Sequence, residues 1–246
     1  MVSAGIDPSI NSTGVCIMEC AGTIESIKTF YYIVGNKPKK STANFIDSNQ
    51  DKFGYIDYGK VDASKEKEYY KKELLKTENI LKSAEALNDI LTCACPDIAV
   101  MEGVSYGSTS GASIVDLAGL NFVYRTVLID NVCDDMIIAS PMEIKKFATG
   151  NGGVDKDIMI RVWSLCEKLD IDPKAKVDDL ADAYFMALYG VCKWYPELEK
   201  SLEIPKVEIP KRTKKKKKNE TTDESIIENF TSIDESETDI FTSTEQ

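Results

Sequence analysis

The stretch VSAGIDPSINSTGVCIME, residues 2–19, decides the fold of the chain. Two short apolar runs, residues 2–7 and 14–19, flank the segment PSINS, whose composition is typical of turns. Short apolar runs bounded by turn residues are typical of strands, so the stretch predicts a β-hairpin. The first run carries one carboxylate, Asp7, at the point where the first strand is expected to end.

Beyond this hairpin, the chain alternates strand and helix patterns. A third strand is expected at about 24–34, whereas residues 36–64, rich in Lys, Asn, Asp and Gly, are expected to form a long loop or insertion. This order predicts an α/β domain in which an antiparallel three-strand meander is continued by strands reached through helical crossovers. The later elements follow from apolar spacing: a helix at about 66–92, a buried strand at 97–101 ending on Glu102, a helix at 113–130, a strand at 136–139, a helix through 158–169 and a last helix from near 177.

Composition and charge divide the 246 residues into one domain and a tail. Hydrophobic residues make up 43% of the chain, enough for a buried core in a domain that spans about 1–204. The tail, 205–246, holds a basic run at 211–218 and then nine acidic residues without a basic one, and this patterning predicts disorder. Residues 1–204 hold 31 acidic and 22 basic residues, so the domain itself carries a net charge of −9.

Several classes of protein are excluded by what the sequence lacks. It contains no histidine, which excludes Ser-His-Asp and Cys-His catalysis and zinc sites that need histidine. None of the seven cysteines forms a Cys-x-x-Cys pair, so reduced, mostly buried thiols are expected. No apolar run reaches the length of a membrane span, and the first residues do not resemble a secretory signal. We therefore expect chemistry that depends on carboxylates, lysines, hydroxyls or thiols, without a membrane partner or a small-molecule cofactor.

Four carboxylates stand out by position: Asp7 and Glu102 at strand ends, and Asp179 and Asp182 three residues apart on the last helix. Residues with that spacing share one helix face, where two like charges are unfavourable unless a cation lies between them. Each acid alone is explained better as a solvated strand end or a helix cap than as a ligand. Together they predict a site for a hard cation such as Mg²⁺, which prefers oxygen ligands, and two such ions support phosphodiester cleavage without a histidine base.

Four segments carry a resemblance to the RuvC family of Holliday junction resolvases. GIDPSINSTG, residues 5–14, resembles the family's opening strand–turn–strand, and MEGVSYG, residues 101–107, resembles its second acidic position. PMEIKKFATGNGGVDK, residues 141–156, resembles its Pro-x-x-Val-Lys and glycine-rich stretch, and DLADA, residues 179–183, resembles its closing acidic pair. The segments occur in the same order as in the family and together cover residues 2 to about 192. The sequence EGVSYGS, residues 102–108, is more similar to phage and other viral members than to the bacterial enzyme.

The resemblance implies an RNase H-like fold with a mixed five-stranded sheet flanked by helices. It also implies a homodimer that makes paired, symmetric nicks across a four-way DNA junction with two Mg²⁺ per active site, for which Mn²⁺ can substitute. Asp7, Glu102, Asp179 and Asp182 carry over as catalytic metal ligands, and Lys145 and Lys156 as lysines that contact DNA. The implied location is the cytoplasm of a bacterial host, or the nucleus or viral factory of a eukaryotic one.

The residues themselves indicate DNA contacts less specifically. Lys145 and Lys146 precede the glycine-rich loop 150–153, which leads into the helix start at Lys156, and such a loop suits a phosphate. An ordinary loop with surface lysines explains the same pattern. Tyr106 suits stacking on an opened base, although an aromatic residue after a strand is more often part of a core.

Three alternative functions share some of these features. Another RNase H-fold nuclease, acting on RNA–DNA hybrids or flaps, would keep the same four acids. A non-catalytic DNA-binding protein on this fold would have no reason to keep them. An actin-like or Hsp70-like ATPase also begins with a Gly-Ile-Asp strand and turn, but it needs two related lobes, and no second copy of the motif is present.

Overall fold

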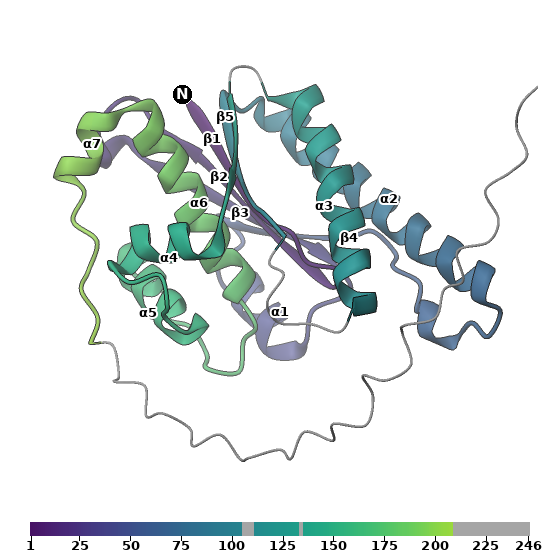
Figure 1. Cartoon of the computed structure of the whole chain (residues 1–246). Coiled ribbons are helices and arrows are strands. Elements are labelled where there is room, and N and C mark those ends of the chain that lie inside the picture. Colours follow the sequence, from purple (N-terminus) through teal and green to yellow (C-terminus); the bar gives the residue numbers. More distant parts are fainter. Residues whose placement is uncertain (105–110, 133–134, 209–246) are drawn as a thin grey trace, which may run out of the picture. The chain divides into compact units, whose positions relative to one another are not determined.

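A computed structural model describes residues 1–104, 111–132 and 135–208, and residues 111–113 by their backbone alone. These residues belong to one compact unit, Met1–Ile209 (Figure 1). The predicted basic and acidic runs of the tail lie outside the described residues. No helix in the described part of the chain combines the length and the hydropathy needed to cross a membrane.

A mixed sheet of six strands forms the centre of this unit, in the order β4-β3-β2-β1-β5-β6. The predicted hairpin is present, because β1 and β2 pair antiparallel with Asp7 opposite Gly14. β3 continues the meander antiparallel to β2, and β5 and β6 extend the sheet in parallel on the other side of β1. The strands are β1 (Val2–Asp7), β2 (Ser12–Glu19), β3 (Lys28–Gly35), β4 (Phe53–Asp57), β5 (Ile98–Glu102) and β6 (Asp135–Ala139).

Helices cover both faces of the sheet (Figure 1). One face packs against α1 (Lys40–Asp47), α4 (Pro141–Thr149), α5 (Lys156–Glu167), α6 (Asp178–Trp194) and α7 (Pro196–Ser201). The opposite face packs against α2 (Tyr69–Ala94) and α3 (Gly111–Asn131). Two short 3₁₀ helices, η1 (Ile24–Ser26) and η2 (Ala63–Lys65), lie in connections, so the third strand begins later than the sequence predicted.

The prediction of a five-stranded sheet with a long loop at 36–64 is wrong. This segment contains α1 and a sixth strand, β4, which pairs in parallel with β3. Its polar composition conceals three buried apolar side chains, Phe45, Ile46 and Phe53. The Phe53 ring stacks on Tyr31 with 4.5 Å between centroids, so the segment contributes to the main core.

Helix α6 lies unusually close to the backbone of β1 and β2. A Cβ atom added at Gly5 would overlap the carbonyl oxygen of Ala183, and one added at Gly14 would overlap that of Asp179. Glycine at these two strand positions therefore permits a close approach that any side chain would prevent. As a result, the first turns of α6 lie directly beside the end of β1, where Asp7 is located.

Candidate active site

Two of the predicted acids lie side by side on adjacent parallel strands. Asp7 is the last residue of β1, and Glu102 is the last residue of β5. Because Ile6 pairs with Met101 in the parallel register, the next residue of each strand emerges at the same edge of the sheet. Asp7 is buried, with 8% of its surface exposed, and Glu102 is half-buried.

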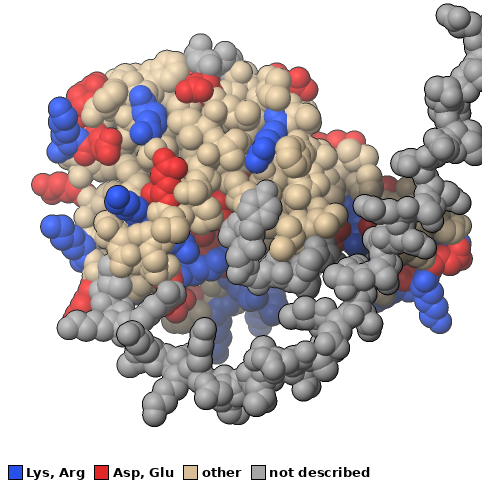
Figure 2. Space-filling view, viewed as in Figure 1, with Lys and Arg blue, Asp and Glu red and all other residues tan. Residues whose placement is uncertain are grey.

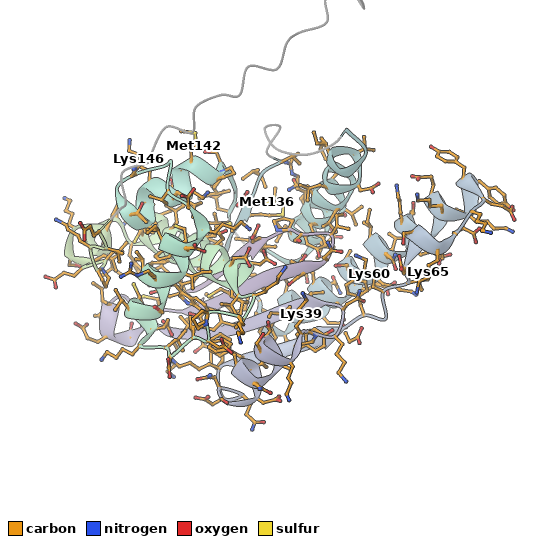
Figure 3. All side chains as sticks on the ribbon, turned by 90° about the horizontal axis from the view of Figure 1, so that it is seen from below. Lys39, Lys60, Lys65, Met136, Met142 and Lys146 are labelled. Carbon is orange, nitrogen blue, oxygen red and sulfur yellow. The ribbon has the colours of Figure 1, made fainter. Side chains whose placement is uncertain are left out.

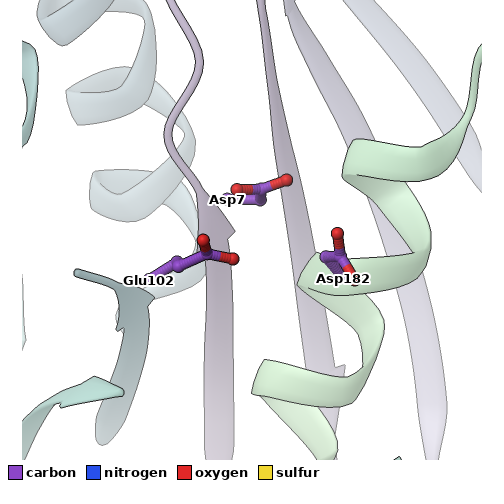
Figure 4. A group of neighbouring side chains, drawn as sticks. All are labelled: Asp7, Glu102 and Asp182. Carbon is purple, nitrogen blue, oxygen red and sulfur yellow. The ribbon is translucent and has the colours of Figure 1, made fainter. Parts of the chain in front are cut away.

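The third carboxylate comes from α6. Asp182 is 6% exposed, and Gly5 and Gly14 allow its helix to approach the strand that carries Asp7. One carboxylate oxygen from each of Asp7, Glu102 and Asp182 lies within 4.8 Å of the others. Figure 4 shows the three side chains converging from two strands and one helix. The sequence therefore predicted three residues that the fold does bring together.

Asp179 lies outside this group of three, although it is nearby. Its carboxylate is 3.9 Å from Nζ of Lys156, and a hydrogen bond with Ser12 also holds it. It lines the same cavity as Asp7 and Glu102, so it faces the site from the first turn of α6. The sequence grouped all four acids equally, whereas the structure separates Asp179 from the closest three.

Burial and mutual repulsion make these carboxyl groups weak acids. Burial raises the pKa of Asp7 well above its ordinary value, and the charges of Glu102, Asp179 and Asp182 raise it further. Burial, followed by the charge of Asp182, raises the pKa of Glu102 to about 7. Burial is also the main reason that the pKa values of Asp179 and Asp182 rise to about 7 and about 6. The site therefore concentrates negative charge that only a cation can neutralise without added protons.

The donor set of the three closest acids fits a hard divalent cation. Carboxylate oxygens are the ligands that Mg²⁺ prefers, and the chain contains no histidine to offer a softer nitrogen. A cation placed among Asp7, Glu102 and Asp182 would favour their ionised forms and so offset the cost of their burial. These residues could hold such an ion.

The predicted DNA-contacting residues lie in different settings. Lys156 borders the acidic cavity, but its Nζ is 2.7 Å from Oδ2 of Asp178, so its charge is already paired. Lys145 is half-buried on α4, and its charge lowers the pKa of both Glu102 and Asp182. Lys146 is exposed on the same helix (Figure 3). Tyr106 lies outside the described residues.

A cavity of about 410 Å³ opens beside the carboxylates and extends toward α3. Several of its lining residues were not predicted from the sequence, among them Ser9, Asn11, Asp116 and Asn121. Asn121 is 2% exposed, and its Nδ2 donates to the carbonyl oxygen of Glu102 at 2.8 Å, which fixes the end of β5. The sequence offered one signal for this residue, because Asn121 is a single amide within the apolar stretch LNFVY, residues 120–124.

Comparisons with known proteins identify the fold. No protein-family model matches the sequence, and no curated protein is significantly similar to it. The RuvC structure of Thermus thermophilus aligns with a TM-score of 0.52 and 16% identity, covering 80% of this chain and 96% of RuvC. The same protein in complex with a Holliday junction substrate aligns with a TM-score of 0.54 and 15% identity over 80% and 97% of the two chains.

The chain therefore has a RuvC-like fold, and the resemblance indicated by its motifs is confirmed at the level of the fold. A complex of Fowlpox virus resolvase with Holliday junction DNA also aligns, over 80% of this chain and 99% of that one, with 14% identity. Its TM-score of 0.37 is too low to support any argument.

Proposed function

We propose that the protein is a Mg²⁺-dependent endonuclease that resolves four-way DNA junctions by paired, symmetric nicks. The observation that carries this proposal is the convergence of Asp7, Glu102 and Asp182 at one edge of a RuvC-like sheet. RuvC is itself a protein whose structure is known in complex with a Holliday junction substrate. A buried acidic group on this fold has a direct chemical use in phosphodiester hydrolysis.

In this proposal the three acids hold divalent cations, and Asp179 completes the set from the first turn of α6. Two bound Mg²⁺ ions would lower the pKa of the attacking water and stabilise the leaving oxygen, with Mn²⁺ as a substitute. Asp7 would share a cation with its neighbours, because it is one of the three closest acids and the charges of Glu102, Asp179 and Asp182 all raise its pKa. The close packing of α6 on Gly5 and Gly14 fixes the position of the helix carboxylates relative to the carboxylates of the strands.

The lysines beside the site would bind the DNA backbone. The charge of Lys145 lowers the pKa of Glu102 and Asp182, and in this proposal the same charge would balance a phosphate bound next to them. Lys156 would exchange its pairing with Asp178 for a phosphate contact, and Lys146 would add an outer contact. Such contacts are electrostatic, so we expect binding to weaken as the salt concentration rises.

Paired nicks require two active sites, and α3 offers a surface for a second copy. Val115, Phe122 and Ile129 recur every seven residues along this helix and are 61–70% exposed. Residues with this spacing lie on one side of a helix, and Figure 2 shows few charged side chains over α3. These three exposed apolar side chains favour a protein interface, with Arg125 lying over the Phe122 ring at 4.8 Å, and we infer a two-fold dimer through α3.

The test is cleavage of a synthetic four-way junction in Mg²⁺, compared with linear duplex, flap and RNA–DNA hybrid substrates. We expect symmetric nicks in the junction alone, and their loss in Asp7→Asn. Cleavage of the hybrid or the flap, but not the junction, would instead assign the site to another nuclease of this fold. Junction binding without any cleavage would support the non-catalytic alternative.

A further inference from the structure

The turn between β1 and β2 borders the acidic site. Pro8, Ser9, Ile10 and Asn11 follow Asp7 directly, and all four line the cavity beside the carboxylates. The position of this turn therefore affects both the direction of the Asp7 side chain and the shape of the cavity that would receive DNA. Contacts that fix the turn are candidates for tuning the site.

Lys60 contacts this turn from the segment that follows β4. Its Nζ donates to the carbonyl oxygen of Ile10 and to Oδ1 of Asn11, both at 2.7 Å. Among the described residues no carboxylate forms an ion pair with Lys60, because Asp62 instead accepts from Ser64 and lies 3.7 Å from Lys65. Partial burial lowers the pKa of Lys60, and the nearby charge of Asp62 acts in the opposite direction.

A chain of hydroxyl groups fixes the other end of the same turn. Thr13 Oγ1 accepts from the backbone N–H of Ser9 at 3.2 Å and shares a 2.9 Å hydrogen bond with the Tyr124 hydroxyl. The Tyr124 hydroxyl shares a further bond of 2.6 Å with Ser83 on α2. The Ser9 side of the turn is thus held by α2 and α3, whereas Lys60 is the side chain that holds its Ile10–Asn11 side.

We propose that Lys60 is a positioning residue for the nuclease site, which holds the β1–β2 turn so that Asp7 and the cavity keep their cleavage-competent arrangement. The proposal rests on the proposed function, and it gives a role to the segment 36–64, which adds β4 to the sheet and packs α1 on one of its faces. The segment delivers one lysine to the active-site turn, and that lysine donates to protein oxygens instead of to DNA. Both bonds direct Nζ toward the turn.

The chain offers a matched control five residues away. Lys65 lies in η2, its side chain is 84% exposed, and the distance of its ion pair with Asp62 is long at 3.7 Å (Figure 3). Lys65→Met removes a positive charge from the same segment without touching the turn. Lys60→Met removes the donor but keeps the aliphatic stem, and Lys60→Arg restores a donor with a different shape.

The experiment measures two quantities on the full chain: the single-turnover cleavage rate at saturating enzyme, and the junction Kd in Ca²⁺. We expect Lys60→Met to lower the rate by about 10–100-fold, the range for residues that orient metal ligands, with less than about a threefold change in Kd. Lys60→Arg should recover part of the rate, and Lys65→Met should leave it unchanged. Equal effects of Lys60→Met and Lys65→Met, confined to Kd, would identify both lysines as phosphate contacts and overturn the proposal.

Hydrogen exchange of the DNA-free protein separates this proposal from the proposed function. Lys60→Met should speed amide exchange in residues 8–12, whereas Lys65→Met should not, whether or not the wild type cleaves a junction. Absence of junction cleavage by the wild type would contradict the proposed function. Unchanged exchange in Lys60→Met would contradict the role of Lys60, even in an active nuclease. Should Lys60→Met fail to fold, Asn11→Ala removes one of the two contacts from the other side and provides the same comparison.

Discussion

The two faces of the sheet are covered in different ways. On one face, α6 contacts the strand backbone directly at Gly5 and Gly14, and most of its residues are buried. On the other face, α2 and α3 pack through side chains, and α3 leaves Val115, Phe122 and Ile129 on the surface. The first face fixes the carboxylates, whereas more of the exposed large apolar side chains lie on α2 and α3 than on the helices of that first face. Under the proposed function, the two sides of the sheet would have different tasks: one positions the carboxylates, and the other carries the proposed dimer contact.

The largest expected effect is the loss of a carboxylate on the tightly packed side. Asp7→Asn or Asp182→Asn should lower the junction cleavage rate by at least about 100-fold, because even residues that only orient metal ligands cost up to that factor. Asp178→Asn is the matched control, since Asp178 pairs with Lys156 outside the group of three. A single-turnover assay in Mg²⁺ measures all three variants. Comparable losses in Asp178→Asn and Asp182→Asn would contradict the assignment.

A pair of glycine substitutions tests the difference between the faces. Gly14→Ala places a methyl group against the Asp179 backbone, so we expect about 1–3 kcal/mol of destabilisation together with reduced cleavage. Gly119→Ala on α3 meets only Ile80 Cδ1, at an ordinary 3.7 Å, and should stabilise the helix by about 0.5–1 kcal/mol. Denaturant unfolding measures both changes. Equal changes in the free energy of unfolding for the two substitutions would contradict the difference in packing between the two faces.

The proposed dimer contact of α3 is tested by introducing a charged side chain among its exposed apolar residues. Phe122→Asp should weaken self-association by about 30-fold or more, the effect of losing a central aromatic contact worth about 2 kcal/mol. The control Leu74→Asp changes an exposed leucine of α2, where we expect no change in association. Sedimentation velocity over a range of protein concentrations measures both. A wild-type protein that stays monomeric at all concentrations would contradict the dimer.

The smallest expected effect is a pH dependence of stability without metal. The raised pKa values mean that the folded protein binds protons more tightly than the unfolded chain, so stability is greatest at acidic pH. It should fall as the pH rises from about 4 to about 7, by about 2–4 °C in Tm for each kcal/mol lost. Thermal melts in EDTA should show this slope, and Asp182→Asn should flatten it. A Tm that rises between about pH 4 and about pH 7 would contradict the predicted direction of the pH dependence.

Most of the fold could be predicted from the sequence because its strands are strongly patterned. The hairpin around Asp7 and the strand ending on Glu102 have clear turn residues or continuous apolar runs. The sixth strand could not be predicted, since FGYID is short and lies among Lys, Asn and Asp residues. Its assignment depends on contacts of Phe53 with Tyr31, which are distant in the chain and have no local signature.

The candidate site was predictable to a similar degree. Asp7, Glu102 and Asp182 were recognisable as charges on otherwise apolar elements, and the fold brings them together. The separate setting of Asp179 and the pairing of Lys156 with Asp178 depend on helix placement, which spacing along the chain does not determine. Lys60 gave no signal, because its partners are a backbone carbonyl and an amide about fifty residues away.

Cleavage of a supercoiled plasmid that extrudes a cruciform tests the central claim most directly. Two coordinated nicks across the four-way junction convert the plasmid to a linear product, whereas a single nick gives an open circle. We predict a linear product for the wild type in Mg²⁺, no product for Asp7→Asn, and no cleavage of a plasmid without the inverted repeat. Open circles alone, or equal cleavage of both plasmids, would contradict a junction resolvase with paired active sites.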